Sequence, residues 1–283
     1  MKLFRNRYIA ELAAKNAVVH VFLMIVTVSC LFPIFWMVRS SLMTNATIFT
    51  DQSLFPKEVH WQNYLEAWTK GNFAVYCLNS IIYTVSVVFG IVVVASMAAF
   101  AFSRLHFWGR DVIFYMFVAA MMIPLPGSFV PLFVMMNKMH LINTRLGYIL
   151  CMINVGLSLS ILLLKTFFDK MPSDLEDAAR IDGCNRLQIW WHVALPLARP
   201  ALAVVVIYNS LNVWNEYILA SLLLNDKDLM PLQKGLMVFN GAYLTDYPVL
   251  MAGLTMTALP IIVVYLMMQK HIVKGLSSGA IVG

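Results

Sequence analysis

The sequence has few charged residues: only 12% of its 283 residues are Asp, Glu, Lys or Arg, whereas 61% are hydrophobic. Its mean hydropathy of +0.77 lies well outside the range of soluble globular domains. The length alone would suggest two soluble domains, but this composition indicates a polytopic membrane protein. The net charge of +6 comes from scattered basic residues that form no continuous patch, so we expect no nucleic-acid partner.

The sequence also lacks an oxidised framework and the common catalytic motifs. Its four cysteines lie far apart, with neither pairing nor metal-ligand spacing. There is no HExxH, P-loop, GxSxG or CxxC pair, and the six histidines are dispersed. We therefore expect no catalytic residue, no metal and no cofactor.

Apolar stretches dominate what is present. Six of them reach the length of about 20 residues that spans the hydrocarbon core of a bilayer as a helix. They are residues 18–38, 77–102, 112–136, 146–168, 201–224 and 249–269. The sequence therefore predicts an all-α integral membrane protein with six transmembrane helices. A basic leader makes the first stretch resemble a signal peptide, but its apolar run continues to Val38, so we expect a retained helix.

The positions of Lys and Arg predict the orientation. With a cytoplasmic N-terminus, thirteen of the 20 basic residues fall in inner segments. This predicts a multi-pass membrane protein whose termini, residues 1–17 and 270–283, are both cytoplasmic. Residues 169–200 then form the only long cytoplasmic loop, and residues 39–76 and 225–248 form long outer loops.

The first outer loop contains VHWQNYLEAW, which reads as an amphipathic interfacial helix. Its aromatic residues Trp61, Tyr64 and Trp68 are typical of an aromatic belt at the lipid headgroups. Contact with an external partner is the alternative.

The third stretch is interrupted by Pro124, Pro126, Gly127 and Pro131. Each proline removes a backbone donor and clashes with the preceding turn, so the freed carbonyls need protein or water rather than lipid around them. We expect a bent, interior helix. It either lines a transport path or is a structural kink without ligand contact.

The fifth stretch carries a polar cluster: Tyr208, Asn209, Asn212, Asn215 and Glu216. Steps of three and four place Tyr208, Asn212 and Asn215 on one helix face, with Glu216 close to it. An ionisable residue inside a span is a functional candidate by default, so we assign these four residues to a translocation path. Hydrogen bonding between helices or subunits, without a substrate, is the alternative.

A dense charged block, DLEDAARIDGCNRLQIWWHVALPLARP at residues 174–200, fills the cytoplasmic loop. Ser173 and Glu176 have the spacing of a capping box, which predicts a helix that starts at Asp174. Gly183 suits the left-handed position just past the end of that helix.

A second helix follows the turn. Asn185 and Gln188 repeat the capping spacing, and this helix is expected to end before Pro196. Ala178 and Ala179 keep the first helix thin enough for close approach, and its acidic residues favour docking into a protein cleft over floating at the membrane surface.

The block also resembles a known motif. Asp177, Ala178, Ala179, three residues, Gly183, nine residues, then Val193, Ala194, Leu195 and Pro196 match the spacing of the EAA motif of ABC importer permeases, E-A-A-x3-G-x9-I-x-L-P. Asp177 replaces the usual glutamate and Val193 the usual isoleucine, both conservatively. Further stretches are similar to the sugar branch of that family, typified by the second membrane subunit of the maltose importer. They are LNSIIYT from Leu78, SMAAFAFSRLHFWGR from Ser96, ARIDGCN from Ala179, WNEYILA from Trp214 and the C-terminal KGLSSGAIVG.

The resemblance implies a type I importer permease fold with a cytoplasmic coupling helix. One helix, residues 18–38, would precede a five-helix permease core at residues 77–269 that includes the coupling loop. The implied partners are a second permease subunit in a heterodimer, two ATPase subunits that hydrolyse ATP, an extracytoplasmic solute-binding protein and a sugar substrate. The implied location is the lipid bilayer of a bacterial or archaeal plasma membrane.

The resemblance also assigns roles to residues. Residues implied to couple to the ATPases are Glu176, Asp177, Ala178, Ala179, Asp182, Gly183, Leu195 and Pro196. Asn79 joins the predicted translocation path, and Asn240 and Gly241 are implied to contact the binding protein.

The expected function is a permease subunit for an oligosaccharide or a related carbohydrate. A sugar phosphate such as glycerol 3-phosphate is the alternative cargo, although no arginine lies inside a predicted span, which favours a neutral sugar. A membrane-integral enzyme or sensor is the alternative class.

Overall fold

A computed structural model of the chain describes residues 2–239 and 245–280. All regular elements in these ranges are helices. The α-helices are α1 (Lys2–Ser41), α2 (Gln62–Lys70), α3 (Phe73–Arg104), α4 (Arg110–Ala120), α5 (Leu125–Lys138), α6 (Arg145–Asp169), α7 (Asp174–Ile181), α8 (Arg186–Ile189), α9 (Leu195–Leu197), α10 (Arg199–Trp214), α11 (Ile218–Leu223), α12 (Leu232–Gly235) and α13 (Tyr247–Ala280). A π-helical turn, Trp190–Ala194, and two 3₁₀ turns, Lys227–Leu229 and Leu236–Phe239, complete them.

Three described helices are long and apolar enough to cross a membrane: Asn16–Ser41 within α1, α3, and α6. A fourth span is possible if Arg186–Leu197 and Arg199–Trp214, bent by 80° at their junction, are counted together. Tyr247–Val263 of α13 is a shorter apolar helix. The predicted stretches 18–38, 77–102 and 146–168 therefore lie within helices of spanning length.

Two predicted spans are not continuous helices. The stretch 112–136 is divided into α4 and α5 by residues 121–124, so the expected bend is a complete break. Pro124 is extended, with ψ 130°, because a proline cannot continue the α4 hydrogen-bond pattern. Met122 and Ile123 at the break are exposed, so the predicted interior position is wrong for this chain taken alone. The stretch 201–224 is likewise divided, into α10 and α11.

The chain divides into two compact units. Unit 1 contains Met1–Gly71 and Val238–Met256, and unit 2 contains Asn72–Met237 and Thr257–Gly283. The predicted permease core, residues 77–269, thus falls mostly in unit 2, and α13 belongs to both units.

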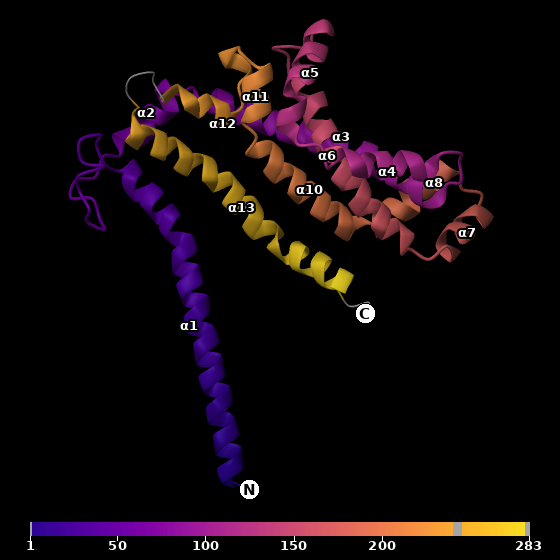
Figure 1. The fold of residues 1–283 in the computed structure, drawn as a ribbon, viewed down its shortest axis with the longest axis horizontal. Helices are drawn as coiled ribbons and strands as arrows, with labels where there is room; N and C mark the ends of the chain where they lie inside the picture. Colours follow the sequence, from indigo (N-terminus) through magenta and orange to yellow (C-terminus); the bar gives the residue numbers. More distant parts are fainter. Residues whose placement is uncertain (1, 240–244, 281–283) are drawn as a thin grey trace. The chain divides into compact units, whose positions relative to one another are not determined.

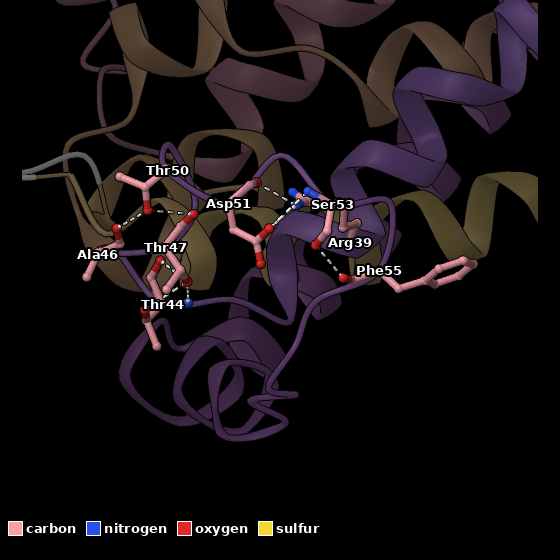
Figure 2. Close-up of polar contacts among 8 residues, drawn as sticks. All are labelled: Arg39, Thr44, Ala46, Thr47, Thr50, Asp51, Ser53 and Phe55. Carbon is pink, nitrogen blue, oxygen red and sulfur yellow. Dashed lines mark hydrogen bonds and ion pairs between the residues drawn. The ribbon is translucent and has the colours of Figure 1, made fainter.

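In unit 1 the last turn of α1 organises the segment that follows it. Arg39 is buried and donates hydrogen bonds of 2.7 Å to the carbonyl oxygens of Ser53 and Asp51 (Figure 2). Its guanidinium also lies 4.5 Å from the centre of the Trp36 ring. Hydrogen bonds from Ser53 hold the pKa of the Asp51 carboxyl below its ordinary value. Arg39 therefore lies within the first helix of spanning length, one residue beyond the expected end at Val38, and its side chain holds the segment that follows.

The rest of unit 1 includes the predicted interfacial helix, which is α2. Tyr64 points inward and shares a 2.7 Å hydrogen bond with the Ser41 hydroxyl, whereas Trp61 and Trp68 are exposed. The existence of the helix is confirmed. The choice between an aromatic belt and a partner contact stays open for the two exposed tryptophans.

The core of unit 2 is built from α3, α6 and α10, which pack along one another (Figure 1). Small residues allow close approach: Ala95 and Ala99 of α3 are fully buried, and a Cβ on Gly156 of α6 would lie 2.3 Å from Asn209 Oδ1. The rings of Tyr83, on α3, and Tyr148, on α6, meet edge to face, with 4.7 Å between the ring centres.

Contacts at the helix ends establish that α3 and α6 run parallel. At their C-terminal ends, the Arg104 guanidinium donates to the carbonyl oxygens of Phe168 and Met171. At their N-terminal ends, Arg145 Nη2 donates to Asn79 Oδ1 at 2.9 Å. The chain between them, which contains α4 and α5, must therefore return over the full length of α3.

The contacts of α10 give it the opposite direction. Its buried Asn209 donates to Ser160 Oγ at 3.0 Å, and Glu216, just beyond its end, accepts from Tyr148 at 3.1 Å. As the position in α10 rises, its partner in α6 falls, so α10 is antiparallel to α6. The segment 170–198 consequently lies at the same end of unit 2 as Arg104.

Candidate functional site

Helix α7 begins at Asp174, as predicted, but the predicted capping box does not form. Ser173 has helical backbone angles, φ −65° and ψ −29°, and its side chain makes no capping hydrogen bond. The three acidic side chains of the first turn instead stabilise the N-terminal end of α7, because their negative charge interacts favourably with the helix dipole. Glu176 cannot complete a box because its carboxylate turns away from Ser173 and into the protein.

Glu176 is the only buried acid among the described side chains. Its Oε1 lies 2.9 Å from Nε of Arg104, at the end of α3, and its Oε2 lies 3.8 Å from Arg180 Nη2. Glu176 is therefore held inside the protein by α3. Glu176 was implied to couple to the ATPases; its side chain is 6% exposed, so it does not form part of the exposed surface of α7.

The turn after α7 has the geometry that the sequence predicts. Gly183 has φ +83°, which is the left-handed region that favours glycine. The amides of Gly183 and Cys184 donate to the carbonyl oxygens of Arg180 and Ala179 at 3.0 and 2.9 Å. This pair of bonds is the Schellman arrangement, which ends a helix and redirects the chain.

The second helix begins with the predicted capping box but does not end where expected. Asn185 accepts from the Gln188 amide at 2.9 Å, and the Gln188 side chain accepts from the Asn185 amide at 2.8 Å. The helix then continues through Pro196, because a π-helical turn, Trp190–Ala194, widens the backbone just before it. In that turn the Leu195 amide donates to the Trp190 carbonyl, so Pro196 enters α9 in its first turn, where a proline is tolerated.

One side of α7 and α8 is exposed, apolar and acidic. Of the two motif alanines, Ala178 is exposed and Ala179 is buried. Ile181 is 87% exposed, and Leu175 and Leu187 are exposed on the same two helices. We call this surface the α7 surface. It consists of Asp174, Leu175, Asp177, Ala178, Ile181, Asp182 and Leu187, all exposed.

The remaining coupling residues of the sequence prediction lie in α9, beyond the π-helical turn. Leu195 is half-buried and packs against the core of unit 2, whereas Pro196 is exposed.

The polar residues of α10 separate into an exposed and a buried group. Tyr208, Asn212 and Asn215 are exposed on one face, as their spacing predicts. The side-chain amides of Asn212 and Asn215 each donate to the carbonyl one turn earlier, at 2.9 and 2.8 Å. Asn209 is buried, and its hydrogen bond to Ser160 joins α10 to α6.

Glu216 does not lie on the face of a continuous helix, which corrects the sequence prediction. Helix α10 ends at Trp214, and the Glu216 carboxylate accepts from the amides of Leu219 and Ala220, at 2.5 and 3.0 Å. A carboxylate that satisfies these amides starts a new helix, α11, and so interrupts the span. Glu216 is thus engaged by α11 and by Tyr148.

Asn79 is buried rather than exposed to an open path. Its side chain donates to the carbonyl oxygens of Asp228 and Met230 at 2.8 and 3.1 Å and accepts from Arg145. The Tyr83 hydroxyl donates to the Leu229 carbonyl at 2.7 Å. The first half of the predicted outer loop is therefore folded onto α3.

Further contacts continue this arrangement. The Leu232 amide donates to Ser80 Oγ at 2.7 Å, and a Cβ on Gly235 would lie 2.1 Å from the Tyr76 ring, so only glycine fits there. Asn240 and Gly241, the predicted contacts of the binding protein, lie outside the described residues. In the described part of the chain no group of three His, Cys, Asp or Glu is placed to hold a metal ion.

Comparison with known proteins decides the family. Residues 90–278 match the family model of the binding-protein-dependent transport system inner membrane component. The chain belongs to this family. It is therefore a multi-pass inner-membrane permease subunit of an ABC importer, and it is a transport subunit rather than an enzyme.

Relatives of this permease carry carbohydrate names. The diacetylchitobiose uptake system permease protein NgcG of Streptomyces coelicolor is 33% identical, over 93% of this chain and 88% of its own length. The probable starch degradation products transport system permease protein AmyC of Thermoanaerobacterium thermosulfurigenes is 30% identical, over 88% and 90%. A crystal structure of a bacterial ABC transporter that imports the acidic polysaccharide alginate contains a similar chain, with a TM-score of 0.78, 28% identity and coverage of 90% and 95%.

Proposed function

We propose that this permease forms one half of the translocation path for an oligosaccharide. The observation that carries the proposal is the exposed face of α10, where Tyr208, Asn212 and Asn215 offer neutral hydrogen-bonding groups. An amide has two donors and two acceptor sites, and sugar hydroxyls both donate and accept, so the two match in chemistry. The named cargoes of the relatives support a carbohydrate.

A sugar phosphate fits this face less well, because phosphate is recognised by Arg and Lys. Two cations of unit 2 at that end of the helices, Arg145 and Lys234, are engaged elsewhere. Arg145 donates to Asn79. The Lys234 ammonium donates to the carbonyl oxygens of Leu224 and Ala220 and so caps the C-terminal end of α11. Burial lowers the pKa of Lys234.

The chain is proposed to cross the membrane six times, with both termini in the cytoplasm. The parallel arrangement of α3 and α6 supports counting α4 and α5 together as one interrupted crossing. α10 with α11, α1 and the apolar part of α13 supply the other crossings. This topology places residues 170–198 on the cytoplasmic side.

The α7 surface is proposed to dock into one of two ATPase subunits. Its exposed apolar side chains, Leu175 and Ile181, would be covered by the partner, and Asp177 and Asp182 would meet basic groups. A second permease subunit and an extracytoplasmic binding protein would complete the importer, and the 225–248 loop would contact the binding protein.

The cargo is tested by uptake in vesicles that contain the assembled importer. Asn212→Ala and Asn215→Ala should each lower uptake of a neutral oligosaccharide by about 2- to 10-fold, the usual range for one lost hydrogen bond. Asn137→Ala, an exposed amide on α5, is the matched control and should leave uptake unchanged. Normal assembly with wild-type uptake from both α10 variants would contradict the proposal, and uptake of glycerol 3-phosphate in place of the oligosaccharide would favour the phosphate.

A further inference from the structure

Glu176 and Asp177 are adjacent acids of α7 that differ in burial. The Asp177 side chain is 61% exposed and belongs to the α7 surface, whereas the Glu176 side chain is 6% exposed and faces the core of unit 2. A carboxylate is almost never buried unless a cation or several donors compensate its charge. The nearer compensating cation is Arg104, at 2.9 Å, and the more exposed Arg180 lies at 3.8 Å.

Arg104 joins three elements at one point. It is the last residue of α3, and its side chain is 13% exposed. Its Nη2 donates to the carbonyl oxygens of Phe168, in the last turn of α6, and of Met171, just beyond it. Its Nε lies 2.9 Å from the Glu176 carboxylate of α7. A planar guanidinium with five N–H groups is suited to such a three-way contact, and lysine is not.

The contact between Arg104 and Glu176 is an ion pair rather than an aligned hydrogen bond. Although Nε and Oε1 lie 2.9 Å apart, neither atom has a hydrogen-bond partner of good geometry. Attraction between charges depends weakly on orientation, whereas a hydrogen bond fixes an angle. The pair can therefore stay intact when the angle of α7 changes, so that α7 remains joined to α3 while it moves.

We propose that Arg104 is a positioning residue for coupling: its guanidinium ties Glu176 of α7 to the adjoining ends of α3 and α6, so that movement of α7 is passed to both helices directly. This inference rests on the proposed docking of an ATPase at the α7 surface. Without the ion pair, α7 would act on the core only through its buried apolar side, such as Ala179, and through the chain segments at its two ends. Both of these can rotate or slide more easily than a clamped helix.

A second contact supports the same junction. Ser103, next to Arg104, donates to Asp169 Oδ1 at 2.7 Å, and Lys165 donates to the other oxygen of Asp169 at 2.8 Å. The ends of α3 and α6 are thus joined by two neighbouring polar links. Arg104 is the link that also reaches α7.

The experiment uses the complete importer, reconstituted in vesicles with its ATPases and binding protein. The variants are Arg104→Gln, Glu176→Gln and the double variant, with Arg110→Gln as the matched control. Arg110 is a half-buried arginine at the start of α4 whose guanidinium pairs with its own neighbour Asp111 at 2.8 Å. Three quantities are measured: the amount of ATPase bound, the stimulation of ATP hydrolysis by loaded binding protein, and the sugar taken up per ATP.

Each single variant leaves one buried charge without its partner, so reduced assembly is expected from them and is not the decisive result. The double variant has no unpaired charge. It should assemble with normal amounts of ATPase, yet show stimulation and uptake per ATP reduced by about 2- to 30-fold, the range over which single positions modulate coupling between sites. Arg110→Gln should behave as the wild type in all three measurements.

A double variant with normal assembly, stimulation and uptake per ATP would overturn the inference, because the pair would then be only a neutralised buried charge. Ile181→Arg separates this failure from failure of the proposed function. It alters the exposed α7 surface, and it should abolish ATPase binding. If Ile181→Arg binds ATPase normally, the proposed docking surface is wrong and the inference falls with it. If it loses the ATPase while the double variant is fully active, only the role of Arg104 is wrong.

Discussion

Gly183 stands in open space. It has φ +83°, and no atom lies within 4 Å of the position that a Cβ would occupy. A Cβ there would meet no other part of the chain, so within this chain the effect of a substitution comes from the backbone. A β-branched residue in the left-handed region costs about 1–2 kcal/mol, whereas asparagine tolerates that region.

Gly183→Val should therefore shift the turn between α7 and α8, whereas Gly183→Asn should preserve it. In the assembled importer we expect Gly183→Val to insert and express normally, to bind the ATPase less well, and to lose the response of ATP hydrolysis to loaded binding protein. Gly183→Asn should retain most of that response. If the two variants are equally active, or equally impaired, the left-handed turn is not what the coupling requires.

The residues of this loop also separate what sequence can predict from what it cannot. The left-handed glycine and the Asn185–Gln188 capping box were predicted because both depend on neighbours within a few positions. The role of Glu176 was missed because its partner is Arg104, on another helix. The same capping spacing occurs at Ser173, so spacing alone could not distinguish the box that forms from the one that does not.

At the scale of elements, α3 holds the first half of the outer loop in place. Asn79 donates to two loop carbonyls, and Tyr83 donates to a third. Removal of a buried hydrogen-bonding group costs about 1–3 kcal/mol when its partners are left unpaired. The loop should therefore open more often when Asn79 is lost than when only the Tyr83 hydroxyl is lost.

Asn79→Ala should speed amide hydrogen exchange in residues 226–235 and make Lys227 and Lys234 more sensitive to trypsin. Tyr83→Phe should have a smaller effect of the same kind. Exchange in α10 should not change in either variant, which serves as the internal reference. Equal protection of the loop in wild type and Asn79→Ala would show that the hydrogen bonds are not needed. Apolar packing of loop residues such as Leu232 and Gly235 would then hold the loop against α3.

Helix ends and breaks were the least predictable elements. The prolines predicted a bend near Pro124, and the helix is instead fully broken there, between α4 and α5. Proline also predicted a helix end before Pro196, but there a π-helical turn accommodates the proline and the helix continues. The break after Trp214 has no proline at all and depends on the Glu216 carboxylate, which caps α11. Its sequence signal, an acid inside a span, is equally typical of a transport residue.

At the scale of the whole molecule, hydropathy predicts how many apolar segments exist but not how each crosses. The direction of helices is the additional information that the structure supplies in unit 2. The C-terminal ends of α3 and α6 contact each other and must lie on the same side of the membrane. An even number of crossings between the two helices would place these ends on opposite sides. One crossing by α4 and α5 together satisfies the contacts of Arg104 and Arg145, and a re-entrant pair does not.

This parity argument predicts the side on which four exposed positions lie. With the native cysteines replaced, single cysteines would be introduced at Trp108, His140, Asp182 and Asp226, all of which are exposed, Trp108 at 98%. A maleimide that cannot cross the membrane, added to the outside of intact cells, should label positions 140 and 226. Positions 108 and 182 should react only after the membrane is opened.

Labelling of 108 and 140 from the same side would mean that α4 and α5 form a re-entrant pair. The α7 surface would then lie on the opposite side of the membrane from an ATPase that uses cytoplasmic ATP, and the six-crossing topology and the docking proposal would both be wrong.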